Sequence, residues 1–237
     1  MERKITFYEK YVKRPMDFCL ALGAIIGLSP VLLITAYLVK KKLGSPVLFK
    51  QPRPGRNEKI FNLYKFRTMT DERDENGNLL PDDVRLTDFG KKLRATSLDE
   101  LPELINILKG DMAVVGPRPL LVRDMLFMTD GQRKRHSVRP GLSGLAQVNG
   151  RNNVTWEEKL AWDLKYLKGI TFCGDWKIIG VTFKKAFARE GINTDGMDTA
   201  EDLGDCLLRE GKITQQEYDE KMSVAKMMLM QFENGRV

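Results

Sequence analysis

The residues best suited to chemistry are two adjacent carboxylates, Asp99 and Glu100. They lie where a helix over 97–108 is expected to begin, with Ser97 as the N-cap and Glu100 completing a capping box. Carboxylates at a helix N-terminus have a plain structural use, because the helix dipole stabilises them. The same place can also serve catalysis, since an aspartate beside a bound phosphate can attack phosphorus and form an acyl phosphate. In that interpretation Glu100 binds a metal ion or assists proton movement.

Attack by a carboxylate on a phosphate brings two anions together, so the reaction needs Mg²⁺ and cationic side chains. Arginine suits this task because its guanidinium group binds phosphate oxygens in pairs, and a cluster of arginines suits a diphosphate. Arginines near expected turns are Arg53, Arg56, Arg67, Arg85, Arg94, Arg118, Arg139 and Arg151. Taken singly, each of them is more simply a solvated surface residue.

Several familiar sites are absent from the sequence. It contains no GxGxxG after a strand, no GxxxxGK[ST] and no HExxH. His136 is the single histidine, which excludes a histidine metal cluster. The three cysteines, Cys19, Cys173 and Cys206, are far apart and form no CxxC pair, so neither a disulfide framework nor a zinc site is expected.

Composition limits the size of the core and the class of protein only loosely. The 237 residues suffice for one core with a small appendage, and a mean hydropathy of −0.34 excludes a polytopic membrane protein. The formal charge of +7 suits nucleic acid, anionic lipid or phosphorylated substrates. It fits a mildly basic soluble protein equally well.

One segment, residues 18–39, is a charge-free run of 22 residues. As a straight helix it would be ~33 Å long, just enough to cross a hydrocarbon core. Ser29-Pro30 near its midpoint predicts a bend, and basic residues flank both ends, so neither orientation of a span is preferred. A re-entrant segment that bends at Ser29-Pro30 satisfies both flanks, with the Ser29 hydroxyl as a partner for a freed carbonyl. A kinked single span and a buried helix are the alternatives.

The remaining pattern predicts short elements. A β-hairpin is expected over 46–67 with Pro-Arg-Pro-Gly as its turn, followed by a polar loop over 71–84. Helices are expected over 97–108, 120–128 and 156–167, and no helix fits the glycine-rich stretch 138–151. Two helices, about 200–210 and 214–232, are predicted near the C-terminus, the second capped by Thr214 with Glu217.

Several short motifs follow one another along residues 10–190. In chain order they are Lys13-Arg14 with Asp17; Ser29-Pro30; Gly44-Ser45-Pro46-Val47 with Gln51, Arg53 and Gly55; Tyr64-Lys65-Phe66-Arg67-Thr68-Met69; Leu93-Arg94 with Ser97-Leu98-Asp99-Glu100-Leu101-Pro102; Gly110-Asp111-Met112 with Val115-Gly116-Pro117-Arg118-Pro119; and Arg139-Pro140-Gly141 with Gly144 and Gln147-Val148-Asn149-Gly150-Arg151. Each is weak alone, but their order is very specific. On these residues the chain resembles the bacterial sugar transferases, also called monotopic phosphoglycosyl transferases.

The resemblance implies an α+β, mainly helical fold: a re-entrant membrane helix broken at Ser29-Pro30, and a cytosolic helical catalytic domain with a small β-hairpin. It implies an enzyme at the cytoplasmic face of the bacterial inner membrane. That enzyme moves a sugar-1-phosphate from a UDP-sugar to polyprenyl (undecaprenyl) phosphate and releases UMP. This is the first membrane step of glycan assembly, and it follows a ping-pong mechanism with Mg²⁺.

By the same resemblance Asp99 is the nucleophile of an Asp-Glu dyad with Glu100, and Asp99 is also the expected metal ligand. The phosphate- and nucleotide-binding residues implied are Lys65, Arg67, Arg94, Arg118 and Arg151. The chain departs from the family pattern at Glu103, where many relatives carry Gln, and at Ala113, where Ser is frequent. Neither departure removes a named role, although both could affect substrate choice.

Three parts are expected: the membrane helix region over 1–43, the catalytic domain over 44–190, and a helical appendage over 191–237. The appendage lies outside the resemblance and is interpreted as an interaction surface. Expected partners are a UDP-sugar, polyprenyl phosphate and membrane lipid, with downstream glycosyltransferases or self-association through the appendage, and no nucleic acid. Two rival functions stay open, a basic membrane-attached binding module and a catalytically silent scaffold.

Overall fold

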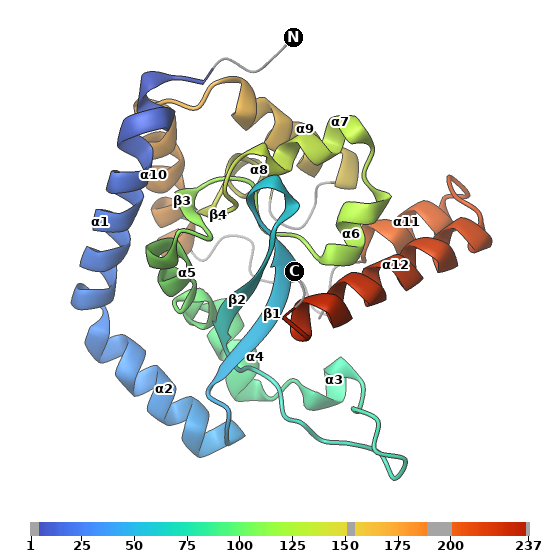
Figure 1. Cartoon of the computed structure of the whole chain (residues 1–237). Helices are drawn as coiled ribbons and strands as arrows, with labels where there is room; N and C mark the ends of the chain where they lie inside the picture. Colours follow the sequence, from blue (N-terminus) through green and yellow to red (C-terminus); the bar gives the residue numbers. More distant parts are fainter. Residues whose placement is uncertain (1–4, 151–154, 189–200, 236–237) are drawn as a thin grey trace.

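The computed structural model describes residues 5–150, 155–188 and 201–235, which are mostly helical (Figure 1). The α-helices are α1 (Lys13–Gly27), α2 (Ser29–Leu43), α3 (Asp82–Arg85), α4 (Asp88–Ala95), α5 (Glu103–Lys109), α6 (Val122–Phe127), α7 (Asp130–Arg133), α8 (Leu145–Asn149), α9 (Trp156–Lys168), α10 (Phe172–Ala188), α11 (Leu203–Arg209) and α12 (Gln215–Glu233). A π-helical turn, η1 (Tyr8–Val12), precedes α1, and the 3-10 turns are η2 (Arg56–Glu58), η3 (Leu98–Glu100) and η4 (Lys134–Ser137). The strands are β1 (Leu48–Pro54), β2 (Ile60–Phe66), β3 (Ala113–Val115) and β4 (Gly141–Ser143).

In Figure 1, α1 and α2 run along one edge of the molecule, while α11 and α12 lie along the opposite edge. The hairpin of β1 and β2 lies between them. The mainly helical fold with a small hairpin, expected from the sequence, is confirmed.

Strands β1 and β2 pair antiparallel, from Leu48 opposite Phe66 to Pro54 opposite Ile60. The hairpin predicted over 46–67 is therefore confirmed, but the predicted turn is wrong. β1 continues through Pro54, and the chain reverses after Gly55, whose N–H donates to the Lys59 carbonyl at 2.9 Å. Prolines fit in β1 because it belongs to a sheet of only two strands and has a free edge.

A second sheet, not predicted from the sequence, pairs β3 with β4 in parallel, with Ala113 opposite Gly141. The backbones approach so closely that a Cβ on Gly141 would lie 2.0 Å from the Gly116 nitrogen. Only glycine fits there. The pairing brings the loop after β3, which carries Arg118, beside the glycine-rich stretch. The prediction that this stretch holds no helix is wrong: α8 forms because it packs against α9 and α10.

Helices α1 and α2 are bent by 65° at Leu28. The Ser29 hydroxyl donates to the Ile26 carbonyl at 2.8 Å, which confirms the expected use of that side chain. Among the described residues no single helix is long and apolar enough to cross a bilayer, and this bent pair alone meets that test in combination.

The buried face of the bent pair is unusual because it includes charged side chains. Its inward side chains on α1 are Lys13, Asp17 and Ala21, each four residues from the next. Large apolar side chains instead point outward: Phe18, Leu22, Ile26, Leu28, Val31, Leu33, Ile34 and Tyr37. We call these residues the apolar outer face.

Candidate active site

The Asp-Glu pair lies on η3, a tight turn rather than the start of a long helix. The predicted capping box at Ser97 is wrong, because Ser97 is left-handed at φ 55° and makes no capping bond. Helix α5 begins only at Glu103, after Pro102, and the Glu100 carboxylate turns to cationic partners instead.

Glu100 is the centre of a charged cluster. It accepts from Lys65 Nζ of β2 at 2.7 Å and from an Arg118 guanidinium nitrogen at 2.5 Å. Lys65 also lies 3.4 Å from Glu103, a largely buried carboxylate on α5. Burial alone would raise the pKa of Glu100. The charges of Arg118 and Lys65 outweigh burial and hold this pKa far below its ordinary value. Burial and the charge of Glu100 raise the pKa of Glu103. Glu100 is therefore a fixed anion that positions two cations.

Asp99 has the opposite environment. Its residue is only 7% exposed, and no side chain or backbone group in the described ranges donates a hydrogen bond to its carboxylate. Burial, followed by the charge of Glu100, raises the pKa of Asp99 to about 6, against the pull of Lys65, Arg94 and Arg118. A buried carboxylate without donors, beside cations, makes Asp99 a candidate for a functional role.

The other residues predicted to bind phosphate lie at varied positions. Arg94 on α4 donates to the Thr68 hydroxyl at 3.2 Å, and its charge acts on Asp99. Arg67 is buried, and its nitrogens donate to the Met69 and Ser45 carbonyls at 2.8 and 2.9 Å. It also pairs with Asp71 at 2.6 Å, so its present contacts position the end of β2. Arg151 lies outside the described residues.

A small cavity of about 90 Å³ opens beside the cluster. It is lined by Arg53, Leu63, Lys65, Glu103, Arg118, Pro119 and Leu120. Arg53 donates to the Pro119 carbonyl at 3.3 Å, while its buried Nε has no partner. Burial and the neighbouring Arg118 lower the pKa of Arg53 to about 10. In the sequence Arg53 is one of many arginines near turns, and only the hairpin register brings it to this cavity.

Two contacts from α1 hold the elements that flank the site. Arg14 donates to the Ile107 and Leu108 carbonyls at 2.6 and 2.9 Å, which caps the C-terminal end of α5. Asp17 accepts from the Val114 N–H of β3 at 3.1 Å. Since α5 follows the Asp-Glu pair and β3 precedes Arg118, the bent helix pair supports both halves of the site.

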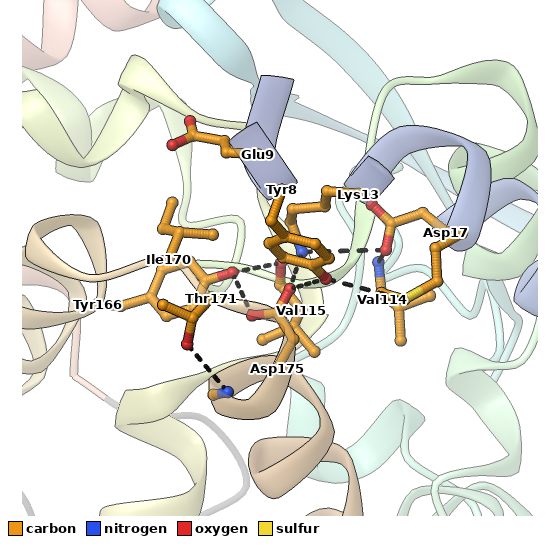
Figure 2. A network of polar contacts seen from close by, with 12 residues as sticks. Tyr8, Glu9, Lys13, Asp17, Val114, Val115, Tyr166, Ile170, Thr171 and Asp175 are labelled. Carbon is orange, nitrogen blue, oxygen red and sulfur yellow. Dashed lines mark hydrogen bonds and ion pairs between the residues drawn. The ribbon is translucent and has the colours of Figure 1, made fainter. Parts of the chain in front are cut away.

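A second buried charged group, the anchor network, lies deeper along α1 (Figure 2). It consists of Tyr8, Lys13, Asp17, Tyr166 and Asp175. Asp175 of α10 accepts from the hydroxyls of Tyr8 and Tyr166, each at 2.8 Å, and pairs with Lys13 at 2.5 Å. Figure 2 shows these side chains converging from η1, α1, α9 and α10. Of this group only Lys13 and Asp17 belong to the motifs that carry the family resemblance.

Within the described residues no three carboxylate, histidine or cysteine side chains gather as a metal-binding group. Mg²⁺ commonly takes one or two protein carboxylates together with substrate phosphates. The buried Asp99 carboxylate, which has no hydrogen-bond donor among the described residues, is chemically suited to be such a ligand. Glu100 is already held by Lys65 and Arg118.

The site thus combines a buried carboxylate of raised pKa with cations suited to an anionic substrate. A model of the bacterial sugar transferase family matches residues 8–189. The chain belongs to this family.

Three relatives illustrate the similarity. An uncharacterized sugar transferase of Bacillus subtilis is 50% identical over 190 residues, which is 80% of this chain and 94% of the relative. A UDP-glucose:undecaprenyl-phosphate glucose-1-phosphate transferase of Klebsiella pneumoniae is 40% identical over 74% of this chain. An undecaprenyl-phosphate galactose phosphotransferase of Salmonella typhimurium is 34% identical over 77% of this chain. The match covers only 40% and 42% of the latter two relatives.

Proposed function

We propose that this enzyme transfers a sugar-1-phosphate from a UDP-sugar to polyprenyl phosphate and releases UMP. The names of the Klebsiella and Salmonella relatives support this reaction class. The observation that carries it is Asp99: a buried carboxylate with a raised pKa, next to the cations that Glu100 holds. A raised pKa makes the ionised carboxylate a stronger nucleophile, and the cations offset its repulsion from phosphate.

The reaction proceeds in two displacements. An Asp99 carboxylate oxygen attacks the phosphorus that carries the sugar, the bond from this phosphorus to the bridging oxygen breaks, and UMP leaves with that oxygen. The polyprenyl phosphate oxygen then attacks the same phosphorus, which forms the diphosphate-linked product and frees the Asp99 carboxylate. Each step transfers the phosphoryl group from one anionic oxygen to another. Positioned positive charge is required because these anions repel each other.

The cations have distinct roles in this mechanism. Lys65 and Arg118 bind the donor diphosphate, and Glu100 orients them. Arg94, close enough to influence Asp99, stabilises charge on the transferred phosphoryl group. Arg67 positions the end of β2 and reaches the nucleotide only if its contact with Asp71 opens. Arg151 is proposed to bind phosphate on the basis of the motif alone.

Mg²⁺ is the proposed cofactor. When bound, it neutralises charge on the diphosphate of the donor. Asp99 would provide the protein ligand, with phosphate oxygens completing the coordination.

The bent pair is proposed as a re-entrant anchor at the cytoplasmic face of the bacterial inner membrane. The apolar outer face supports this, because Leu33 is 71% exposed and Ile34 60%. In this anchor the 65° bend between the two helices lets both enter the membrane from one side, where both basic flanks then lie. Single cysteines at Glu9→Cys and Lys41→Cys, in a chain whose own cysteines are replaced, should both react with an impermeant reagent from the cytoplasmic side. Reaction from opposite sides would refute the anchor but not the chemistry.

Mass spectrometry of the enzyme mixed with a panel of UDP-sugars, without lipid, tests the reaction. We expect a phosphosugar adduct on Asp99 and one UMP per adduct with at least one donor. The matched control is Asp82→Asn, which removes an exposed carboxylate distant in sequence from the site. A silent scaffold, the alternative function, predicts neither adduct nor UMP with any donor.

A further inference from the structure

The C-terminal hairpin, which we define as α11 and α12, docks on the transferase domain instead of standing free. Both helices pack on α6 (Figure 1). The hairpin is also joined to α9, where Trp156 Nε1 donates to the Glu201 carbonyl at 3.0 Å and Lys212 pairs with Glu157 at 2.8 Å. It lies beyond residues 8–189, the part that matches the family, so family membership gives it no role.

The docking contact is a closed apolar core. Leu203 of α11 is 4% exposed and forms one buried cluster with Phe127, Met128 and Leu160. The ring of Phe127 also faces Tyr218 of α12, with centroids 5.6 Å apart. Such burial of apolar surface is sufficient to hold a short hairpin in place.

Glycine at position 204 sets the closeness of this contact. A Cβ on Gly204 would lie 2.6 Å from the nearest ring carbon of Phe127 and 2.8 Å from the next. Phe127 is itself buried, so its ring has little room to move. A larger residue at this position is therefore expected to push α11 off α6.

The same core continues to the cavity of the candidate active site. Leu120 packs against the cluster around Leu203, and Leu120 also lines the cavity that contains Arg118. Asp124 makes a second link, because one of its oxygens accepts from Leu203 N–H at 3.1 Å and the other from Leu121 N–H at 3.0 Å. Hairpin and loop thus share one carboxylate and one apolar core.

We infer that the C-terminal hairpin is an intramolecular clamp that holds the segment 116–122, from the end of β3 to the first residue of α6, and with it Arg118, in the geometry that binds the donor. The identity of the donor in this inference rests on the proposed function. The link between the hairpin and the segment that carries Arg118 rests on the packing and hydrogen bonds alone. The hairpin acts through the loop and touches no reacting atom, so it is a positioning element.

Gly204→Val in the full-length chain tests the clamp, and Ser223→Val, on the exposed side of α12, is the matched control. Hydrogen exchange measures docking over 203–233 and loop order over 116–122, and calorimetry with UDP measures the donor site. We expect Gly204→Val to speed exchange in both segments and to weaken UDP binding ~5-fold, with Ser223→Val unchanged.

Two results would overturn the clamp. One is faster exchange over 203–233 with no change over 116–122 and none in UDP affinity. The other is unchanged exchange over 203–233 in both Gly204→Val and Leu203→Asp, since the proposal assigns docking to this contact. A wild-type chain that binds no UDP refutes the proposed donor site instead, and exchange over 116–122 still decides the clamp.

Discussion

Two buried charged clusters lie in this molecule, and they are built in opposite ways. In the anchor network, Asp175 is 0% exposed and receives two hydroxyl donors and the Lys13 ammonium. In the candidate active-site cluster, one oxygen of Glu100 accepts from both Lys65 and Arg118, but its neighbour Asp99 receives no hydrogen bond from any described residue.

This difference in hydrogen bonding is the one expected between a structural network and a catalytic site. A buried charge with all its partners fixes the position of the elements that supply them, here η1, α1, α9 and α10. A buried carboxylate without donors costs free energy in the folded state, and that cost is tolerated where a substrate will supply the missing partners. The pKa of about 6 at Asp99 is the electrostatic sign of this cost.

The largest effect is expected from Asp99→Asn, which removes the carboxylate without hydrogen-bond donors. We expect UMP release from the productive UDP-sugar to fall by ~10⁴-fold, because the amide is a poor nucleophile toward phosphorus. The measurement is a coupled UMP assay, and attachment to membrane vesicles should persist. Activity within tenfold of wild type would mean that another group attacks.

Asp175→Asn tests the other cluster. The substitution removes the negative charge beside Lys13 and leaves Asp17, 3.9 Å away, as its nearest carboxylate, so we expect the free energy of unfolding to fall by about 3 kcal/mol. Thermal unfolding against Asp82→Asn measures it. A loss below about 1 kcal/mol would show that the network is not structural in the sense argued here.

Glu100→Gln tests the paired carboxylate of the candidate active site. The amide still accepts a hydrogen bond but no longer neutralises Lys65 and Arg118, so the two cations lose their fixed geometry. We expect kcat to fall by ~10²-fold with the fold intact. An effect confined to KM would assign Glu100 to donor binding alone.

The pH profile tests the raised pKa directly. Only the ionised Asp99 can attack, and its pKa of about 6 lies above the ordinary range, so UMP release should rise with pH and level off above about 6. Between pH 6 and pH 5 the ionised fraction of Asp99 falls from about one half to about one tenth, so the first-turnover rate should drop about fivefold at saturating donor. A rate that stays flat down to pH 5 contradicts the assigned pKa.

The smallest effect expected is on stability. The folded state holds the Asp99 proton to a higher pH than the unfolded chain does, so the carboxylate reduces stability as pH rises from about 4 to about 6. Asp99→Asn should therefore be more stable than wild type by about 1 to 2 kcal/mol at pH 7.5 and nearly equal at pH 4. Calorimetry at both values measures it, and a variant less stable at pH 7.5 would contradict the argument.

The sequence alone determined the short-range features of this protein. Ser29-Pro30 predicted a bend because proline cannot continue a hydrogen-bonded turn, and alternating apolar residues predicted the hairpin. The motif order along residues 10–190 also predicted the family, which the match over 8–189 confirmed. These properties depend on neighbours within a few residues or on residue identity.

Tertiary structure decided what depends on distant contacts. Glu100 has the spacing of a capping-box residue after Ser97, and its spatial neighbours Lys65 and Arg118 attract the carboxylate more strongly than a helix N-terminus does. Asp175 has no local signal at all, and its partners come from residues as far away in sequence as Tyr8. Burial and charge at Asp99 arise from several separate elements, so only the folded chain sets its pKa.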